Sequence, residues 1–330
     1  MDIPNLKMSD GHSIPVFGLG TWQADRGVVG NAVRLAVDLG YRHFDCALVY
    51  GNENEVGQAL REKIRDGVVK REDLFITTKL WNTYHKPELV VAGCKKSLEN
   101  LGLDYVDLYL MHWPFAFQVP KGRMTVEETS RRHENEQFMP RGPDGNVLFA
   151  DYDYVDTWKQ MEKCVELGLT KSIGLSNFNS VQVDRVVKAA TIQPVMNQVE
   201  CHPYLNQKKL TQFCKDRGIL ITAYSPLGSG ARSSAKPEDP VLLKDKQIGE
   251  IAQKMGKTPA QIILRYLVQS NVIPIPKSTN PGRLKENISI FDFKLSNDDM
   301  KTIDDLNMNL RYIQFVDAKS HKDYSFNIEY

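Results

Sequence analysis

Short apolar runs recur along almost the whole chain, and stretches with apolar residues at helical spacing separate them. Apolar runs of about four to eight residues are typical of buried strands, whereas apolar residues three and four apart indicate one face of a helix. The chain is therefore expected to alternate strands and helices. The predicted strands are Val16–Leu19, Arg42–Asp45, Leu74–Lys79, Val106–Met111, Ser172–Ser176, Val195–Glu200, Ile219–Tyr224 and Val272–Ile275. The predicted helices cover 27–39, 53–65, 86–101, 157–167, 180–190, 205–217, 245–255 and 258–269.

Local signals mark some of the helix ends. Asn52 precedes the 53–65 segment and Glu55 follows three residues later, a pattern that predicts an N-terminal cap. Pro87 falls where a first-turn proline is tolerated, and Gly102 falls where a helix can stop.

Eight strand–helix repeats indicate an α/β protein with a parallel sheet, either closed as a (β/α)8 TIM barrel or open and doubly wound. The number of repeats favours closure. The glycines of the 18–23 segment lack the third glycine of a dinucleotide fingerprint and come too early for one, which weakens the doubly wound alternative. We expect residues 1–330 to form one barrel domain, with an N-terminal β-hairpin in 1–15 around Lys7–Ile14 and a C-terminal tail at 307–330. Two long βα loops, 114–156 and 226–244, are expected to be functional lids or insertions.

Composition narrows the class of partner. The 330 residues are 42% apolar and 25% charged, with a formal net charge of +1, so neither a nucleic acid nor a membrane surface is an expected partner. The five cysteines are widely spaced without a CxxC pair, so we expect no disulfide framework and no metal site. Residues 1–20 lack the apolar segment of a secretion signal, and a cytosolic protein is predicted.

Four ionisable residues lie at or just past the predicted strand ends. In a barrel, the loops after the strands carry the function, so Asp45, Tyr50, Lys79 and His112 should meet at one mouth. Carbonyl reduction needs a proton at oxygen, and tyrosine is a poor acid with an ordinary pKa of about 10. A neighbouring ammonium is expected to lower that pKa. The set therefore predicts Tyr50 as proton donor, Lys79 as its tuning group, Asp45 as the anchor of Lys79, and His112 as a hydrogen-bond donor to the carbonyl.

With these four residues and the stretches around them, the chain resembles the aldo-keto reductase superfamily over essentially its full length. The resemblance implies a (β/α)8 barrel, a catalytic tetrad at the four residues above, NADPH as cofactor and a small carbonyl compound as substrate. The matching stretches are Gly18-Leu19-Gly20-Thr21-Trp22, Gly40-Tyr41-Arg42-His43-Phe44-Asp45-Cys46-Ala47, Tyr50-Gly51-Asn52-Glu53, Thr78-Lys79-Leu80-Trp81, His112-Trp113-Pro114, Gly174-Leu175-Ser176-Asn177-Phe178, Asn197-Gln198-Val199-Glu200-Cys201-His202-Pro203, Ala223-Tyr224-Ser225-Pro226-Leu227-Gly228 and Ile275-Pro276-Lys277-Ser278.

A phosphate site is predicted in 277–283, after the eighth strand, where a helix begins. Backbone N–H groups at a helix start, with Lys277 and Arg283 beside them, suit the 2′-phosphate of NADP. Asn280 stands where the family often has threonine, which leaves one phosphate hydrogen bond open. The resemblance implies further cofactor contacts: Glu286 and Asn287 at the adenine, Ser176, Asn177 and Gln198 at the carboxamide, Tyr224 stacked on the nicotinamide, Ser225, Leu227 and Ser229 along the pyrophosphate, and Gly20, Thr21, Trp22, Ser278 and Thr279 elsewhere along the cofactor.

Aromatic residues beside the tetrad predict an apolar substrate pocket. Trp158, at a helix start, is expected to be core instead. By resemblance the tail folds over the pocket, which implies an apolar or aromatic aldehyde or ketone. The Phe115-Ala116-Phe117 segment is similar to insect members of the family, some of which reduce ketosteroids such as 3-dehydroecdysteroids. The expected substrate-binding residues are Trp22, Val49, Tyr50, Trp81, His112, Trp113 and Phe115.

Two other classes of function stay open on the same fold. One is a cofactor-binding regulatory subunit, as in the β-subunits of potassium channels, and the other is a structural protein such as a lens crystallin. The family resemblance favours a monomer.

Overall fold

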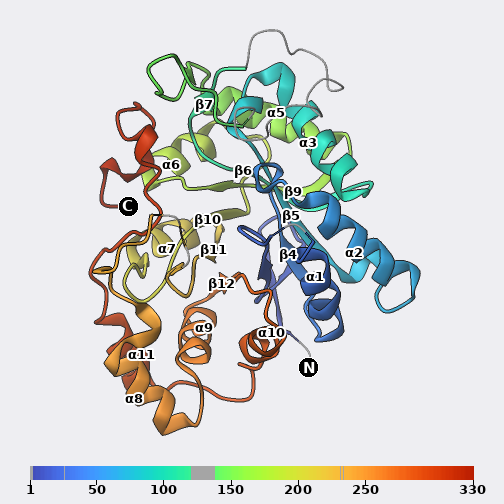
Figure 1. Ribbon diagram of the computed structural model, residues 1–330. Coiled ribbons are helices and arrows are strands. Elements are labelled where there is room, and N and C mark those ends of the chain that lie inside the picture. Colours follow the sequence, from blue (N-terminus) through green and yellow to red (C-terminus); the bar gives the residue numbers. More distant parts are fainter. Residues whose placement is uncertain (1–2, 26, 120–137, 231, 233) are drawn as a thin grey trace.

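Eight parallel strands form one sheet that closes on itself (Figure 1). The computed structural model describes residues 3–25, 27–119, 138–230, 232 and 234–330. Closure runs between the first and last strands, where Gly18 N and Gly20 N donate to the carbonyls of Pro274 and Pro276, at 3.1 and 3.3 Å. The predicted (β/α)8 barrel is therefore confirmed. In sheet order its strands are β3 (Leu19–Gly20), β4 (His43–Asp45), β5 (Phe75–Leu80), β6 (Val106–Met111), β9 (Thr170–Ser176), β10 (Met196–Glu200), β11 (Leu220–Tyr224) and β12 (Val272–Pro274).

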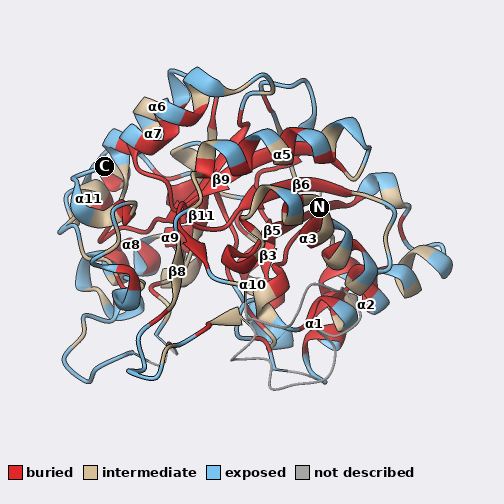
Figure 2. Cartoon of the chain, turned by 90° about the horizontal axis from the view of Figure 1, so that it is seen from above, coloured by how far each residue is buried: buried red, intermediate tan, exposed pale blue. Residues whose placement is uncertain are grey.

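Helices surround the strands, with their inner faces buried and their outer faces exposed (Figures 1 and 2). Each predicted helix is present, and α11 is an addition that the apolar spacing did not indicate. Its start does carry a local signal, because Ser296 and Asp299 form a capping box. The helices are α1 (Val29–Asp38), α2 (Glu53–Arg65), α3 (Pro87–Leu101), α5 (Tyr154–Glu166), α6 (Ser180–Ala189), α7 (Lys208–Lys215), α8 (Lys246–Met255), α9 (Pro259–Gln269), α10 (Pro281–Ile288) and α11 (Asn297–Asp304).

The helix ends follow the sequence signals with one exception. Pro87 opens α3, and Gly102 ends it in the left-handed region with φ +62°. Asn52 precedes α2 as expected, but its side chain does not cap the helix. Its Nδ2 donates instead to the carbonyls of Thr21, at 2.9 Å, and Ala24, at 3.3 Å. The predicted cap is therefore wrong, because a partner distant in sequence uses the side chain.

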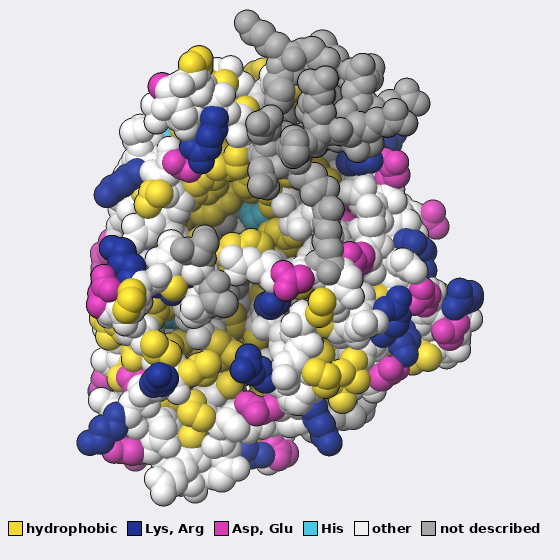
Figure 3. Space-filling view, viewed as in Figure 1, with side chains coloured by type: hydrophobic (Ala, Val, Ile, Leu, Met, Phe, Trp, Pro, Cys, Tyr) yellow, Lys and Arg dark blue, Asp and Glu magenta, His cyan; other side chains and the backbone are white. Residues whose placement is uncertain are grey.

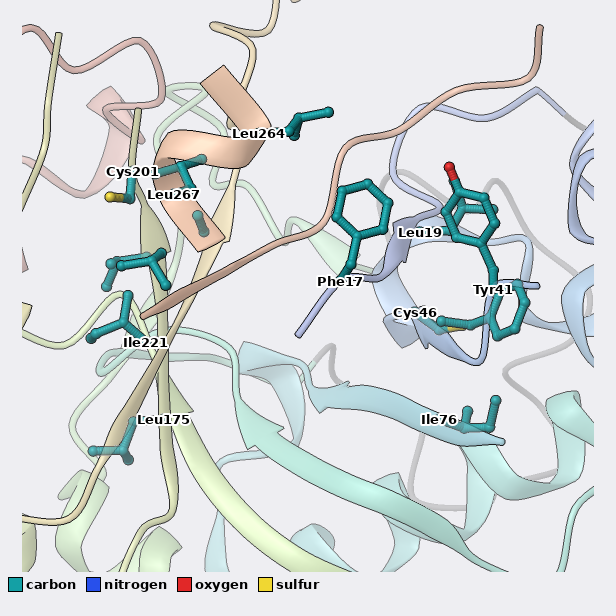
Figure 4. Packing of buried hydrophobic residues seen from close by; sticks show 14 of the residues in the cluster. Phe17, Leu19, Tyr41, Cys46, Ile76, Leu175, Cys201, Ile221, Leu264 and Leu267 are labelled. Carbon is teal, nitrogen blue, oxygen red and sulfur yellow. The ribbon is translucent and has the colours of Figure 1, made fainter. Parts of the chain in front are cut away.

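Side chains alternate between the two faces of each strand. Outward-facing residues pack beneath the helices, and Figure 4 shows Ile76 of β5, Leu175 of β9 and Ile221 of β11 in this layer. Trp158 of α5 is fully buried in it, as predicted. Inward-facing apolar residues fill the barrel near the N-terminal ends of the strands. They include Phe75, Leu108, Leu110, Met196 and Ile273. The barrel interior at the C-terminal ends of the strands holds polar side chains instead, among them Asp45 and Lys79.

An antiparallel hairpin closes the N-terminal end of the barrel. It consists of β1 (Asn5–Lys7) and β2 (Ser13–Pro15), and its Met8 and Ile14 pack against the interior cluster. A second ribbon, β7 (Ala116–Phe117) paired with β8 (Phe149–Ala150), was not predicted and joins the two ends of the long 114–156 loop. The middle of that loop, 120–137, lies outside the described residues. No helix in the described part of the chain is long and apolar enough to cross a membrane. All five cysteines are free thiols.

Candidate active site

Three of the four candidate catalytic residues come from the C-terminal ends of barrel strands. Asp45 ends β4, Lys79 lies near the end of β5, and His112 directly follows β6. Residues 43, 45, 75, 77 and 79 alternate inward on their strands, so the strand pattern aims Asp45 and Lys79 into the barrel. Tyr50 enters from a 3-10 turn, Leu48–Tyr50, that connects β4 to α2.

Lys79 is the centre of the group. Its Nζ donates to Asp45 Oδ1 at 2.6 Å, to the Cys46 carbonyl at 2.9 Å and to Tyr50 Oη at 3.2 Å. The lysine side chain is 0% exposed, so these three oxygens replace its hydration. Gln198 Nε2 donates to the second oxygen of Asp45 at 2.7 Å. The ammonium is therefore held beside the phenol by a fixed carboxylate.

His112 faces Tyr50 across the mouth. The two ring centroids are 5.9 Å apart at 79°, and the Trp81 ring also packs edge-on against the imidazole, with centroids 5.2 Å apart. Burial lowers the pKa of His112 well below 6.5, and the nearby Lys79 ammonium and His85 lower it further. The imidazole is thus neutral at physiological pH, and as a neutral ring it can donate one N–H to a carbonyl oxygen.

The pKa of Tyr50 moves in the direction opposite to the expectation. Burial raises it well above 10, with the Asp45 carboxylate as the next cause. The expected net lowering of the Tyr50 pKa is therefore wrong for this structure, because burial disfavours the charged phenolate. Tyr50 holds its proton, and Lys79 is placed to stabilise negative charge on Oη once that proton leaves.

The residues expected around the nicotinamide lie beside the tetrad on β9, β10 and β11. Asn177, with φ +61°, donates through Nδ2 to the His112 carbonyl at 3.0 Å, and Tyr224 Oη donates to Asn177 Oδ1 at 2.7 Å. Ser176 Oγ donates to the Gln198 carbonyl at 2.9 Å. These side chains form one hydrogen-bonded group joined to Asp45 through Gln198.

The expected cofactor residues near the barrel's closing seam are also brought close to this group. Gly20 pairs with Lys277, and Thr21 Oγ1 donates to the Asp45 carbonyl at 2.8 Å. Gly20 has no room for a side chain, because a Cβ there would lie 2.7 Å from the Ile275 carbonyl oxygen. Trp22 is 36% exposed at the rim.

The predicted phosphate segment leads into α10. Lys277 and Arg283 are exposed, and neither has an acidic partner among the described residues, whereas Ser278 is buried. Asn280 Oδ1 accepts the N–H of Arg283 at 3.0 Å and so caps the helix. Because the Arg283 N–H already donates to Asn280, we expect the side chains of Lys277 and Arg283, more than the backbone, to contact a phosphate.

The remaining expected cofactor residues flank these groups. Glu286 Oε1 accepts from Thr258 Oγ1 at 2.8 Å, and Asn287 is buried beside it on α10. Ser225 and Ser229 both have positive φ, +48° and +45°, in the loop that follows β11. Leu227 and Thr279 are half-buried.

An aromatic cluster stands beside His112. Trp113 packs against Phe315 and Phe326 of the tail, with ring centroids 4.9 and 5.8 Å apart, and Trp81 Nε1 donates to the Phe138 carbonyl at 2.7 Å. Val49 is half-buried at its edge, whereas Phe115 is 0% exposed inside it. Figure 3 shows a hollow on this face, lined by hydrophobic side chains, with histidine atoms visible inside. Phe115 packs between Trp113 and Phe117, with ring centroids 5.6 and 6.0 Å away, and has no exposed surface to offer a substrate.

The sequence model of the Aldo/keto reductase family matches residues 16–308. The chain belongs to the aldo/keto reductase family. This aldo-keto reductase is thus a homologue of NADP-dependent oxidoreductases, and the family generally uses NADPH for carbonyl reduction.

Its relatives are similar over their full length. The chain is 48% identical to "Aldo-keto reductase family 1 member A1" of Xenopus tropicalis, covering 97% of this chain and 96% of that protein. It is 46% identical to the protein of the same name in Mus musculus, covering all of both. The solved aldose reductase of Schistosoma japonicum superposes with a TM-score of 0.88 at 41% identity over the whole of both chains.

Two buried carboxylates of this aldo-keto reductase had no role assigned from the sequence. Glu200, at the end of β10, accepts the N–H groups of Tyr312 and Ile313 at 2.7 and 2.9 Å. Tyr312 Oη in turn donates to the Pro240 carbonyl at 2.7 Å, so one residue links the tail to the 226–244 loop. The position of Glu200 at a strand end was a signal in the sequence for a functional residue. Its role could not be predicted, because its partners lie more than a hundred residues further along the chain.

Glu53 is the second of these carboxylates. It lies three residues after Tyr50 and accepts from Thr78 Oγ1 at 2.5 Å and from Asn100 Nδ2 at 3.2 Å. Burial raises its pKa to about 7. It joins the start of α2 to the outward face of β5, directly behind Lys79.

Proposed function

We propose that this protein reduces apolar or aromatic aldehydes and ketones to alcohols with NADPH, with Tyr50 as the proton donor. The observation that carries the proposal is the buried chain of contacts from Asp45 through Lys79 to Tyr50, opposite a neutral His112. Buried ionisable groups with perturbed pKa values cluster at functional sites, and a carbonyl reductase has a use for a buried lysine that contacts a phenol.

In this proposal the cofactor supplies a hydride to the carbonyl carbon when it is bound. Tyr50 Oη gives its proton to the carbonyl oxygen, and Lys79 Nζ, 3.2 Å away, stabilises the negative charge left on Oη. Asp45 keeps the lysine in place. His112 donates an N–H to the carbonyl oxygen and so orients the substrate for proton transfer.

The residues of this chain fit NADPH. Lys277 and Arg283 offer two exposed cations that have no acidic partner among the described residues, which suits a 2′-phosphate. Tyr224 presents a half-buried ring beside the Asn177 amide, in a position that suits an aromatic amide ring. We propose that Ser176, Asn177 and Gln198 hold the carboxamide, and that Ser225, Leu227 and Ser229 line the pyrophosphate.

The substrate class follows from the aromatic cluster. Trp22, Val49, Trp81 and Trp113 surround the mouth with apolar surface, which suits an aromatic or other apolar carbonyl compound. A ketosteroid belongs to that class and is the larger candidate to test. We further propose a cytosolic monomer with a single barrel domain.

The direct test is NADPH oxidation by the purified protein, followed by absorbance, with 4-nitrobenzaldehyde and separately with a 3-dehydroecdysteroid. Turnover of the aldehyde with NADPH, and much slower turnover with NADH, is the expected result. Turnover of the steroid at comparable kcat/KM would extend the substrate class to ketosteroids. NADPH binding without turnover of either compound would contradict the proposal and favour a regulatory role.

A further inference from the structure

One buried carboxylate joins the two chain segments that carry Tyr50 and Lys79. Glu53 is the first residue of α2, follows Tyr50 by three residues and is 1% exposed. Its Oε1 accepts a hydrogen bond at 2.5 Å from Oγ1 of Thr78, the residue directly before Lys79 on β5. The carboxylate therefore connects the segment of the proposed proton donor to the strand of the lysine.

Thr78 and Lys79 point to opposite faces of β5. Successive side chains of a strand alternate in direction, so Lys79 points into the barrel toward Tyr50 while Thr78 points outward toward α3. Thr78 Oγ1 accordingly lies 3.5 Å from Ser97 Oγ of that helix. Glu53 thus holds β5 from its outer face at the position of Lys79. A shift of the strand against the start of α2 would move Lys79 Nζ relative to Tyr50 Oη.

The turn that carries Tyr50 is attached to β5 at both ends. Before the turn, the Cys46 carbonyl accepts from Lys79 Nζ at 2.9 Å. After the turn, Glu53 accepts from Thr78. The first contact alone would leave the far end of the turn free to move relative to the strand. With both contacts in place, Nζ and Tyr50 Oη lie 3.2 Å apart.

The carboxylate itself is well fixed. Its second oxygen, Oε2, accepts from Asn100 Nδ2 of α3 at 3.2 Å, so two different elements hold the group. Thr78 and Ser97 are fully buried beside it. Because an unpaired buried polar group is unfavourable, alternative arrangements of the Glu53 side chain are disfavoured.

The separation of Lys79 from Tyr50 matters for the chemistry. Lys79 Nζ must be within hydrogen-bond reach of Tyr50 Oη to stabilise the negative charge that forms when the proton leaves. Burial raises the pKa of Tyr50 well above 10, so the phenol depends on the nearby ammonium to release its proton. Catalysis of this kind is sensitive to small displacements of the reacting groups.

We propose that Glu53 is a positioning residue for carbonyl reduction, which acts through Thr78 to hold Lys79 at hydrogen-bond distance from Tyr50. The inference rests on the proposed function and extends it beyond the four residues of the tetrad. Glu53 lies on the outer face of β5 and does not contact the reacting atoms. Its removal should therefore slow the chemical step and leave NADPH binding unchanged.

The test measures the chemical step as the single-turnover rate of NADPH oxidation with 4-nitrobenzaldehyde, in stopped flow. Glu53→Leu removes both hydrogen bonds, and we expect the rate to fall by about tenfold or more, since small misplacements can slow a reaction by about a hundredfold. Glu53→Gln keeps an acceptor for Thr78 and should restore most of the rate. The affinity for NADPH, measured by quenching of tryptophan fluorescence, should be the same in wild type and both variants.

Two further variants separate the two hydrogen bonds of Glu53. Thr78→Val removes the bond to β5 and should slow the reaction as much as Glu53→Leu does. The double variant Glu53→Leu/Thr78→Val should be no slower than either single variant, because both changes break the same link. The matched control is Asn100→Leu, which removes the other bond of the same carboxylate, to α3, and should leave the rate unchanged.

A wild-type rate in Thr78→Val would overturn the inference and leave the proposed function intact. An equal fall in Asn100→Leu would also overturn it, because general loosening around α3 would then explain the loss. If Glu53→Leu does not fold, the comparison of Thr78→Val with Asn100→Leu decides the question. Absence of turnover by wild type would contradict the proposed function itself, and this inference with it.

Discussion

Lys79 Nζ and Asp45 Oδ1 form an ion pair of 2.6 Å between side chains that are 0% and 3% exposed. Removing one partner leaves a buried charge without compensation. We predict that Asp45→Asn lowers the free energy of unfolding by about 3–5 kcal/mol, measured by urea denaturation. The double variant Asp45→Asn/Lys79→Met should recover much of that loss. The control is Asp156→Asn, whose partner Lys159 is 55% exposed and whose loss should cost less than about 1 kcal/mol. A cost for Asp45→Asn as small as the control's would refute the buried pairing.

Arg283 should discriminate between the two nicotinamide cofactors. Arg283→Ala removes a cation without an acidic partner among the described residues, and we expect the KM for NADPH to rise about tenfold or more while that for NADH changes little. Steady-state kinetics with each cofactor measures this. Lys285→Ala removes another exposed cation from the same helix, two residues on, and serves as the control. Equal effects of Arg283→Ala on both cofactors would show that the arginine does not contact the 2′-phosphate.

Tyr312 should couple the tail to the 226–244 loop, because its backbone N–H binds Glu200 and its hydroxyl binds the Pro240 carbonyl. Tyr312→Phe removes only the second contact. We predict faster NADPH release, by about three- to tenfold, in stopped-flow displacement, since the net value of one hydrogen bond is about 1 kcal/mol. Tyr324→Phe breaks a contact within the tail, to the Gln314 carbonyl, and should leave the release rate unchanged. If both variants release NADPH at the wild-type rate, the loop is held by other contacts.

Glu53 should make stability depend on pH. Burial raises its folded pKa to about 7 from an ordinary 4.5, so between these values the folded protein binds more protons than the unfolded chain. Stability should therefore fall as pH rises from 4.5 to 7, and then stay constant with respect to this group. Glu53→Gln keeps an acceptor for Thr78 and should be more stable than wild type by roughly 1–3 kcal/mol at pH 8, but not at pH 4.5.

Urea unfolding of both proteins at the two pH values measures the difference. The exposed Glu250→Gln is the control and should show no pH-dependent gain. A gain for Glu53→Gln that is the same at both pH values would mean that packing, not ionisation, is responsible.

Local pattern was enough to predict the barrel and to bring the tetrad together. Asp45 and Lys79 reach the mouth because strands alternate their side chains, and alternation is visible in a sequence. The roles that the sequence did not predict correctly depend on partners distant in the chain. Asn52 was predicted to cap a helix but donates hydrogen bonds to the 21–24 turn. Glu200 accepts hydrogen bonds from Tyr312 and Ile313, and no signal in the sequence indicated these contacts.

The sign of the Tyr50 pKa was wrong for a related reason. The neighbouring ammonium could be predicted from the motif, but the extent of burial could not, and burial is the larger effect. The β7–β8 ribbon also depends on a distant contact, because Phe117 pairs with Phe149, 32 positions further along the chain. Each of its two strands is too short to show a pattern in the sequence.

The most direct test of the central claim compares wild type with Tyr50→Phe at saturating NADPH and 4-nitrobenzaldehyde. The substitution removes the phenolic oxygen 3.2 Å from Lys79 Nζ and leaves the ring in place. We predict that NADPH binds both proteins with similar affinity, measured by quenching of tryptophan fluorescence, and that kcat falls by about a hundredfold or more in the variant. A variant that retains kcat, or that loses NADPH binding to the same extent as turnover, would contradict the assignment of Tyr50 as the proton donor.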